Sequence, residues 1–377
     1  MMSFKRRVCV SITARPSYSR IRTALEHIAQ FPFIDLEIFC SGSALLDRYG
    51  RIVDLIRADG FNVTEELFTY VEGNEPINMA LTTANTIQAT AQALNRINPD
   101  MVFTIADRYE TLGTAVACSY LGIPLIHVQG GEITGNIDDK VRNAVTQLAD
   151  FHLVSNVHAA TRVERMGGKR NAIHVTGCPS IDLAREALTL PLAHVQQALH
   201  QQGVADLSLD QDFIVVLQHP ETDRHEQSFA QMAMTMDVVA HVGLPTLMFW
   251  PNVDAGADAA TRAIQMFRTA GGAPSVHFVQ NLEGTLFLRL LHQCACLVGN
   301  SSVGIRECAF LGTPVVNIGS RQQGRERASN VMDCDWDSRQ IVMAMRQQLG
   351  QKRYPSSGIY GNGFAGMEIA RVIGELT

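Results

Sequence analysis

Short apolar runs alternate with longer segments of mixed polarity along the first half of the chain. The runs are VCVSITA, LEIFCSG, MVFTIA, PLIHVQG, FHLVS and AIHVTG. Continuous apolar runs of this length are typical of strands that are buried on both faces of a sheet. We therefore predict a parallel sheet that is covered by helices on both sides.

The clearest helix lies between the second and third of these runs. Apolar residues recur at helical spacing from Pro76 to Ile97, and Pro99 follows. Proline is favoured in the first turn of a helix, and it disfavours a helical conformation in the residue before it. Both ends of this helix are therefore marked in the sequence.

The same alternation restarts in the second half of the chain, after the segment TGCPSIDLAREAL and a stretch rich in Gln and His. The apolar runs there are DFIVVLQHP, PTLMFWPN, VHFVQN, CLVGNSS and PVVNIG. A length of 377 residues exceeds what one ordinary core encloses. We predict a second α/β domain, with a boundary near residues 180 to 200. The C-terminal tail holds a glycine-rich loop and one helix, which the pattern alone assigns to neither domain.

Composition narrows the class of protein. The formal net charge is -6 and charged residues make up 18% of the chain, so there is no basic footprint for nucleic acid. The apolar run after Lys5 is short and is interrupted by Arg15 and Pro16, and no later stretch reaches the length of a membrane span. We expect a cytoplasmic enzyme without a nucleic-acid or membrane partner.

Two further features point away from metals and disulfides. The eight cysteines are scattered through apolar runs without metal-ligand spacing, which predicts reduced, mostly buried thiols. The acidic segment DCDWD at residues 333–337 precedes a helical pattern and fits helix capping better than metal binding. We predict no metal and no cofactor.

Ligands of open parallel sheets bind beyond the carboxyl ends of the strands, so the residues that follow each apolar run are the site candidates. These residues are Arg15, Asp107, Arg108 and Glu132 in the first half, and His219, Asn252, Asp254, Ser301, Ser302 and Arg321 in the second half. Two facing domains would close them around one ligand.

The segment GNSSVGIRE places Ser301 and Ser302 between a strand and a predicted helix that continues through GIRECAFLG. Backbone N–H groups and hydroxyls at a helix start bind a diphosphate well, and Glu307 one turn later would accept ribose hydroxyls. Ordinary N-capping is the alternative, and Arg321 after the next strand favours an anion. The chain has no dinucleotide-binding or P-loop glycine motif.

Arg15 and His219 have two interpretations each. Arg15 offers a planar donor fork to phosphate, or it is an exposed loop arginine. His219 stands between a strand and a proline, where a neutral imidazole donates to a sugar or phosphate oxygen, or it is structural.

Carboxylates follow two first-half strands and open the next helix. Asp107 and Glu132 end the strands, and Asp138 and Asp139 come shortly afterwards. Three carboxylates around one cleft repel each other, so one would keep its proton and act as an acid while another acts as a base. The alternative is that each is a helix cap or a surface acid that pairs with Arg108 or Arg142.

Taken together, these segments resemble the hydrolysing UDP-N-acetylglucosamine 2-epimerases of sialic acid biosynthesis over nearly the whole chain. The motifs are ARPSYSR, ADRYE, GGEITGNIDDKVRNAVTQLADFH, TGCPSIDLA, LQHPET, PNVDAG, GNSSVGIRE, GTPVVNIGSRQQGRE and IYGNG. The resemblance implies an α/β GT-B fold of two Rossmann-like domains with the ligand in the interdomain cleft. It implies domains at 1–182 and 183–354, and a C-terminal helix at 355–377 that crosses back to the first domain.

The resemblance also implies functional residues. It assigns acid-base roles to Asp107, Glu132 and Asp139, although a slip of one residue would exchange Asp139 with Asp138. It assigns substrate or UDP contacts to Arg15, Ser19, Arg108, His219, Asn252, Asp254, Ser301, Ser302, Glu307 and Arg321. One departure is Ala106, where much of the family has glycine, which puts the local backbone conformation in question.

The implied reaction splits UDP-N-acetylglucosamine into UDP and N-acetylmannosamine, for sialic acid or a related nonulosonic acid. Alternatives are UDP-diacetylbacillosamine or GDP-N-acetylglucosamine as the substrate of the same reaction, a non-hydrolysing UDP-N-acetylglucosamine 2-epimerase, a GT-B glycosyltransferase, or a catalytically silent nucleotide-sugar binder. We expect a homodimer or homotetramer whose ligand is a nucleotide sugar.

Overall fold

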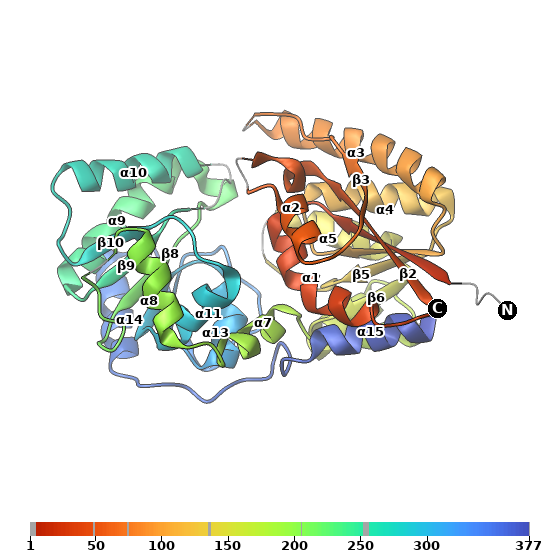
Figure 1. Ribbon diagram of the computed structural model, residues 1–377. Helices are drawn as coiled ribbons and strands as arrows, with labels where there is room; N and C mark the ends of the chain where they lie inside the picture. The colour runs from red at the N-terminus through yellow and green to blue at the C-terminus, as the bar shows by residue number, and fades with distance from the viewer. Residues whose placement is uncertain are drawn as a thin grey trace. The chain divides into compact units, whose positions relative to one another are not determined.

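The computed structural model describes residues 5–47, 50–73, 75–134, 137–204, 206–251 and 256–376. They form two compact units, each built on one parallel sheet (Figure 1). The first unit contains the described residues up to Ile133, Ile137–Asp182 and residues 361–376, and the second contains Leu183–Tyr360. The prediction of two parallel α/β domains is therefore confirmed.

The first sheet has seven strands in the order β3-β2-β1-β4-β5-β6-β7. The strands are β1 (Arg6–Ile12), β2 (Ile34–Ser41), β3 (Val63–Leu67), β4 (Met101–Ile105), β5 (Leu125–Val128), β6 (Phe151–Val154) and β7 (Ile173–Val175). Each of the six predicted apolar runs contains a strand. The sequence analysis missed β3, because an edge strand reading VTEEL needs few apolar residues. The strand order reverses between β1 and β4, which is where ligands of such sheets bind.

Helices cover both faces of this sheet. They are α1 (Arg15–Ile28), α2 (Ile52–Ala58), α3 (Pro76–Ile97), α4 (Tyr109–Leu121), α5 (Ile137–Leu148), α6 (Val157–Arg165) and α15 (Ala365–Leu376). Helix α7 (Ser180–Ala187) begins in this unit, and its residues from Leu183 onward pack in the second unit. One apolar core lies between the sheet and α1, α2 and α15, and another lies between the sheet and α3, α4 and α5. The helix predicted from Pro76 to Ile97 is confirmed at both ends.

The C-terminal helix α15 belongs to the first unit and packs on α1 (Figure 1). The carboxylate of Asp182 accepts hydrogen bonds from the backbone N–H of Ala365 at 2.8 Å and of Gly366 at 2.6 Å. The hydroxyl of Thr23 on α1 donates to the same carboxylate at 3.0 Å. Asp182 therefore fixes the start of α15 at the point where the chain first leaves this unit.

The second sheet has six strands in the order β10-β9-β8-β11-β12-β13. The strands are β8 (Ile214–Leu217), β9 (Thr246–Phe249), β10 (Val276–Val279), β11 (Cys296–Gly299), β12 (Val315–Ile318) and β13 (Val331–Cys334). The helices are α8 (Leu192–Gln201), α9 (Ser228–Val242), α10 (Ala257–Thr269), α11 (Gly284–Gln293), α12 (Ser302–Ile305), α13 (Glu307–Leu311) and α14 (Ser338–Leu349). Two apolar cores again lie on opposite faces of the sheet, which is therefore doubly wound.

The acidic segment at 333–337 joins a strand to a helix. Its first residues end β13, and the carboxylate of Asp337 accepts a hydrogen bond from the backbone N–H of Gln340 at 2.9 Å at the start of α14. The capping prediction is confirmed. The strand was missed because only its first two residues, Val331 and Met332, are clearly apolar.

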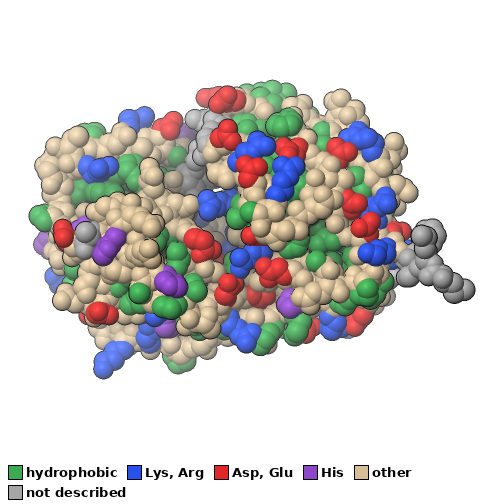
Figure 2. Space-filling model, in the orientation of Figure 1, with side chains coloured by type: hydrophobic (Ala, Val, Ile, Leu, Met, Phe, Trp, Pro, Cys, Tyr) green, Lys and Arg blue, Asp and Glu red, His purple; other side chains and the backbone are tan. Residues whose placement is uncertain are grey.

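The cysteines and the surface agree with the composition. None of the eight cysteines forms a disulfide, and seven are buried, as predicted. On the face shown in Figure 2, basic and acidic side chains are interspersed and do not form a large patch of one sign. Within the described ranges, no helix has the length and apolar character needed to cross a bilayer.

Candidate active site

Three candidate residues of the first unit converge on one buried arginine. Arg142 on α5 is 1% exposed, and its guanidinium donates to the carboxylates of both Asp107 and Asp139. It also donates to the backbone carbonyl of Glu132 at 2.8 Å. Asp107 follows β4, Glu132 follows β5, and Asp139 lies in the first turn of α5. The fold therefore brings together the three residues that the sequence analysis grouped.

The charge of Arg142 changes the electrostatics expected from the sequence. Burial alone would lower the pKa of this guanidinium, but the charges of Asp107, Glu132 and Asp139 outweigh burial, so that its pKa is raised. The acid-base argument from the sequence considered repulsion among carboxylates. The alternative that paired them with an arginine is also correct in part, because one buried cation holds the group together.

The backbone beside these carboxylates is in an uncommon conformation. Ala106, directly before Asp107, has a φ of 67°, and Gln129, after β5, has a φ of 66°. Residues with a Cβ avoid this left-handed region. The question raised by alanine at position 106 is thus answered, because Ala106 adopts the conformation that glycine would favour. The amide N–H of Gln129 donates to the carbonyl of Leu153 at 2.9 Å, which helps to hold it there.

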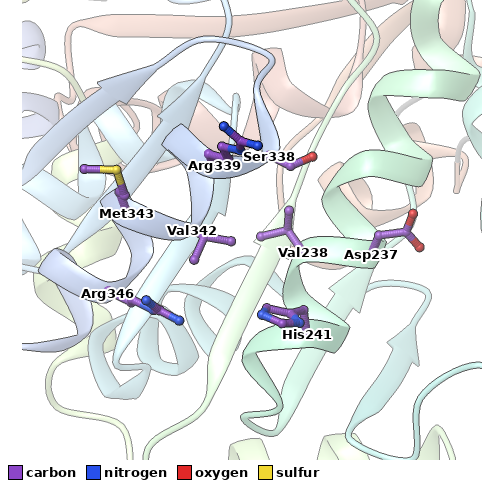
Figure 3. Close-up of a pocket in the computed structure, with 8 residues that line it drawn as sticks. All are labelled: Asp237, Val238, His241, Ser338, Arg339, Val342, Met343 and Arg346. Atoms are coloured by element: carbon purple, nitrogen blue, oxygen red, sulfur yellow. The ribbon is translucent and has the colours of Figure 1, made fainter.

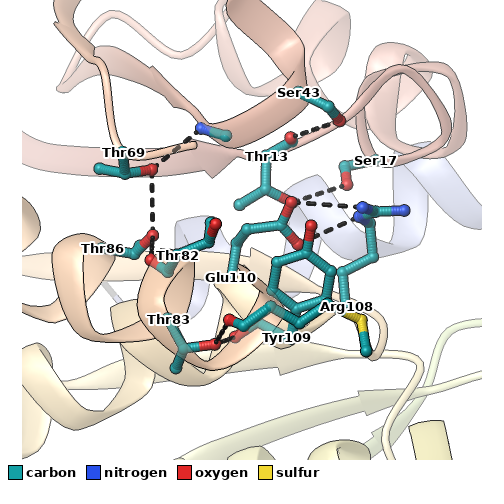
Figure 4. A network of polar contacts seen from close by, with 12 residues as sticks. Thr13, Ser17, Ser43, Thr69, Thr82, Thr83, Thr86, Arg108, Tyr109 and Glu110 are labelled. Atoms are coloured by element: carbon teal, nitrogen blue, oxygen red, sulfur yellow. Dashed lines mark hydrogen bonds and ion pairs between the residues drawn. The ribbon is translucent and has the colours of Figure 1, made fainter. Parts of the chain in front are cut away.

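Arg108 is held by a second buried carboxylate. Glu110, in the first turn of α4, is fully buried, and Arg108 donates to its two oxygens at 3.1 and 3.3 Å. Figure 4 shows Arg108 folded back onto Glu110, next to the hydroxyls of Thr13 and Ser17. A Cβ on Gly42 would lie 2.9 Å from Glu110 Oε1, so that only glycine fits there. The guanidinium of Arg108, 36% exposed, is thereby fixed against Glu110.

Arg15 and Ser19 lie in the first two turns of α1, after β1. Arg15 is exposed, and Ser19 Oγ donates to the carbonyl of Pro16 at 3.4 Å. Since β1 and β4 are neighbours, α1 and Asp107 follow adjacent strands at the point where the strand order reverses. These positions suit a ligand at the carboxyl edge of the first sheet.

In the second unit, His219 and Asn300 pair through their backbone and side-chain amides. Asn300, fully buried after β11, accepts from the N–H of His219 at 2.7 Å and donates to the His219 carbonyl at 2.8 Å. Burial, and then the charge of Arg321, lower the pKa of His219 well below its usual range, so that the imidazole is neutral. A Cβ on Gly299 would lie 2.1 Å from the carbonyl oxygen of Leu217, so glycine allows this close approach of β11 and β8.

Arg321 and Glu221 extend this polar cluster. Arg321 donates to the backbone carbonyl of Asn300 at 3.3 Å, and Gln322 donates to the same oxygen at 3.0 Å. Glu221, which is 1% exposed, accepts from the N–H of Ser320 at 2.9 Å. The loops after β8, β11 and β12 therefore form one connected polar region at the carboxyl edge of the second sheet.

The helix predicted after Ser301 is not continuous. It consists of α12, which has four residues, and α13, which has five, with a break at Arg306, where φ is -97° and ψ is -69°. The Arg306 guanidinium donates back to Ser302 Oγ at 3.2 Å, and Gly304 packs closely on β12. A dipole needs several aligned turns, so the dipole argument for a phosphate site is weaker than the sequence suggested.

The hydroxyl of Ser301 acts as a helix cap. Its Oγ accepts from the N–H of Val303 at 3.4 Å, so that the capping alternative holds for this residue. Glu307 is 6% exposed, and its Oε2 accepts no hydrogen bond from the residues that the structure describes, although Arg306 Nε lies 3.8 Å away. A buried carboxylate oxygen in this state is a ready acceptor for ligand hydroxyls.

Two sequence-predicted residues, Asn252 and Asp254, lie outside the described residues. A groove of ≈ 440 Å³ between α9 and α14 contains none of the candidates (Figure 3). Its lining residues are Asp237, Val238, His241, Ser338, Arg339, Val342, Met343 and Arg346. The candidates instead follow the carboxyl ends of strands in both sheets.

Several residues of these clusters were not among the sequence candidates. Arg142 entered only as an exposed partner of carboxylates, and its position three residues after Asp139 was the available signal. Asn300 follows an apolar strand directly, so the strand-end rule would have selected it. Glu110 carries no comparable signal, because a glutamate in the first turn of a helix is usually solvated.

Comparison with known proteins gives the family. A sequence model described as UDP-N-acetylglucosamine 2-epimerase matches residues 26–374. The chain is 28% identical over 358 residues to the UDP-N,N'-diacetylbacillosamine 2-epimerase (hydrolyzing) of Legionella pneumophila, covering 95% of this chain and 93% of that one. It is 27% identical over 361 residues to the UDP-N-acetylglucosamine 2-epimerase of Neisseria meningitidis serogroup B, covering 95% and 91%.

A solved structure shows the same fold. The UDP-GlcNAc 2-epimerase from Neisseria meningitidis, bound to UDP-GlcNAc, superposes with a TM-score of 0.83 and 16% identity, covering 98% of this chain and 100% of that chain. Two Rossmann-like domains in this arrangement of elements define a GT-B protein. The chain belongs to the UDP-N-acetylglucosamine 2-epimerase family. The resemblance inferred from the motifs is confirmed at the level of the family and of the fold.

The carboxylate cluster should lower the stability of the protein when the buried cation is removed. We expect Arg142→Met to lower the free energy of unfolding by about 3–5 kcal/mol, because it leaves like charges without their counter-ion. Adding Asp139→Asn to Arg142→Met should recover part of that loss, since it removes one of those charges. Urea unfolding at neutral pH measures both effects. The control is Arg96→Met, which breaks an exposed ion pair with Glu65 and should change stability much less. An Arg142→Met protein as stable as its parent would contradict this account.

Proposed function

We propose that this chain is a hydrolysing 2-epimerase that converts UDP-N-acetylglucosamine into UDP and N-acetylmannosamine. The observation that carries the proposal is the convergence of Asp107, Glu132 and Asp139 around Arg142 at the carboxyl edge of the first sheet. Inversion at C2 requires one group that removes a proton and another that returns one to the opposite face. A cluster of several carboxylates supplies both groups.

The order of bond changes follows from the acidity of C2. No carbonyl is adjacent to C2, so its proton becomes acidic only when positive charge develops at C1. The C1–O bond to the diphosphate therefore breaks first, and UDP leaves with the bonding electrons. A carboxylate then takes the C2 proton, which gives a glycal with a C1–C2 double bond. A proton is then delivered to C2 from the other face, water adds its oxygen to C1, and the proton that this water loses passes to a carboxylate.

The second unit would hold the nucleotide in this proposal. Arg321 would offset the diphosphate charge, because a guanidinium binds phosphate oxygens through paired donors. The buried carboxylate of Glu307 would accept the ribose hydroxyls, and the neutral imidazole of His219 would donate to a sugar or phosphate oxygen. In the first unit, Arg15, Ser19 and Arg108 would contact the substrate at the strand ends that carry the carboxylates.

A second substrate deserves a direct test. The Legionella pneumophila relative is described as acting on UDP-N,N'-diacetylbacillosamine by hydrolysis. The same elimination and hydration would apply to that sugar, since its chemistry at C1 and C2 is unchanged. Substituents at C4 and C6 would then decide between the substrates. A panel of UDP- and GDP-linked amino sugars, analysed for the released monosaccharide, distinguishes these possibilities.

Isotope incorporation tests the mechanism. Incubation with UDP-N-acetylglucosamine in deuterated water should give free N-acetylmannosamine with deuterium at C2, because the abstracted proton exchanges with solvent before another is delivered. In ¹⁸O-labelled water, the label should enter the sugar and not UDP, because the C1–O bond breaks. Mass spectrometry of both products reads out both predictions. Product that retains only its original C2 hydrogen would rule out the elimination, and UDP-sugar as the sole product would indicate a non-hydrolysing epimerase.

Adjacent aspartates provide a matched pair for the third carboxylate. Asp139→Asn should lower turnover by about 100-fold or more with UDP affinity nearly unchanged, as expected of an acid-base group. Asp138→Asn should have a much smaller effect, because Arg142 contacts the carboxylate of Asp139. Steady-state kinetics together with calorimetric titration of UDP separates the two effects. The reverse order of losses would move the assignment to Asp138.

Glu307 and Ser302 are assigned to UDP binding. Loss of a neutral hydrogen bond costs on the order of 1 kcal/mol, and loss of one to a charged group such as a phosphate costs roughly 1.5 to 3 kcal/mol. Ser302→Ala should therefore weaken UDP binding by about tenfold. Glu307→Ala should cost at least as much, and Glu307→Gln less, because glutamine keeps one acceptor oxygen. Calorimetric titration with UDP tests this without turnover. The control Glu283→Ala removes the cap of α11 and should lower only the melting temperature. Normal UDP binding by the Ser302 and Glu307 variants would place the nucleotide elsewhere.

A further inference from the structure

Residues of β5 bind both the backbone N–H and the backbone carbonyl of Ala106. Its N–H donates to the carbonyl of Val128 at 3.0 Å, and its carbonyl lies 2.9 Å from His127 Nε2. Ala106 is the left-handed residue that separates β4 from Asp107. A residue with a Cβ leaves this conformation unless its surroundings fix it. These two hydrogen bonds therefore determine the direction in which the chain enters Asp107.

The surroundings of His127 allow one tautomer. A carbonyl oxygen only accepts hydrogen bonds, so the proton of the neutral ring is on Nε2 and points at Ala106. Nδ1 must then accept, and Thr146 Oγ1 lies 3.1 Å from it and donates. Burial lowers the pKa of His127 to about 4, despite the hydrogen bond to Ala106, so that the ring is neutral at neutral pH. His127 is fully buried, which excludes water as a competing partner.

The loop after β5 leaves this pair no room to move. A Cβ on Gly130 would lie 2.9 Å from Thr146 Oγ1 and 3.0 Å from His127 Nδ1. Gly130 thus packs its backbone directly on the His127–Thr146 hydrogen bond. The imidazole is enclosed by β4, β5 and α5, and its orientation is fixed by packing as well as by hydrogen bonding.

Helix α5 holds Asp107 at two points. Arg142 binds the Asp107 carboxylate, and Thr146, one turn later on the same helix, orients the ring that binds the Ala106 carbonyl. The first contact places the charged end of the side chain, and the second places the backbone from which that side chain starts. A shift of either would move the carboxylate relative to Glu132 and Asp139.

We propose that His127 is a positioning residue, whose Nε2–H holds Ala106 in the left-handed conformation and so aims Asp107 into the carboxylate cluster. The proposal deepens the proposed function, because it rests on the catalytic role of Asp107. It assigns no proton transfer to the substrate to His127. It implies that the need for the imidazole depends on the Cβ of residue 106.

Rescue by glycine tests this dependence. His127→Leu should lower kcat by at least about tenfold, with little change in KM or in UDP affinity, because a small displacement of an acid-base group slows chemistry. Adding Ala106→Gly should restore kcat to within about threefold of the parent. Glycine adopts the left-handed conformation without the clamp, by which we mean the hydrogen bond from His127 Nε2–H to the Ala106 carbonyl. Ala106→Gly alone should leave kcat unchanged and raise the melting temperature. All variants are assayed well below their melting temperatures.

The control removes a different buried imidazole. His152 is buried on β6, next to His127 in the sheet, and β5 lies between β6 and β4. His152→Leu should lower the melting temperature, and adding Ala106→Gly should not raise its kcat. A folded His127→Leu/Ala106→Gly protein that stays as slow as His127→Leu would overturn the proposal, and so would equal rescue of His152→Leu. If His127→Leu does not fold, Thr146→Val replaces it, because that variant keeps the imidazole and removes the hydroxyl that orients it.

Melting temperatures separate this inference from the proposed function. Absence of turnover by the parent on every nucleotide sugar would refute the function and leave the clamp to be judged by stability. Without the clamp, Ala106 relaxes and less strain remains for glycine to remove. Ala106→Gly should therefore raise the melting temperature of the parent more than that of His127→Leu, and equal gains would overturn the clamp.

Discussion

The geometry of the first unit depends on compensating the buried charge of one arginine. Arg142 is 1% exposed, and a buried guanidinium is tolerated only when carboxylates and carbonyls surround it closely. Asp107, Asp139 and the Glu132 carbonyl satisfy this requirement from two strand ends and one helix. The same requirement fixes the carboxylates of Asp107 and Asp139, because neither can move away without leaving the cation partly uncompensated. Buried ion clusters add little net stability, but they define one arrangement, and an acid-base site needs a defined arrangement.

In the second unit, mostly neutral groups connect the loops at the strand ends. Asn300 joins the loops after β8 and β11 through amide hydrogen bonds to the His219 backbone, and its own carbonyl receives donors from Arg321 and Gln322. This arrangement brings little negative charge to the strand ends other than the buried carboxylates. An anionic diphosphate would thus meet donors there, whereas the first unit already contains its own counter-ion. This difference in charge agrees with the proposed reaction, in which the first unit transfers protons and the second unit binds the diphosphate.

The sequence predicted elements and strand ends well, because both depend on local patterns. Every predicted apolar run contains a strand, and the helix from Pro76 to Ile97 has its predicted ends. The missed strands β3 and β13 lie at sheet edges, where one side needs no apolar cover. The break at Arg306 was missed because the local pattern does not show tertiary contacts such as the close packing of the nearby Gly304 on β12. The role of Arg142 was missed for the same reason, since burial of a charged side chain is a property of the assembled site.

Backbone conformation shows where local preference stops being informative. Among the described residues, four residues other than glycine have a positive φ. Two of them flank helices: Arg51 precedes α2, and Asn98 follows α3, a position where asparagine commonly adopts this conformation. Ala106 and Gln129 have no such local reason, and both follow strands that carry the carboxylates. Each costs about 1–2 kcal/mol, against a total stability of about 5–15 kcal/mol for a typical domain, so the rest of the fold can hold them. Strain of this kind persists only where the surroundings over-determine the conformation. Its position beside Asp107 and Glu132 therefore indicates that the fold specifies the geometry of these carboxylates more strictly than the local sequence does.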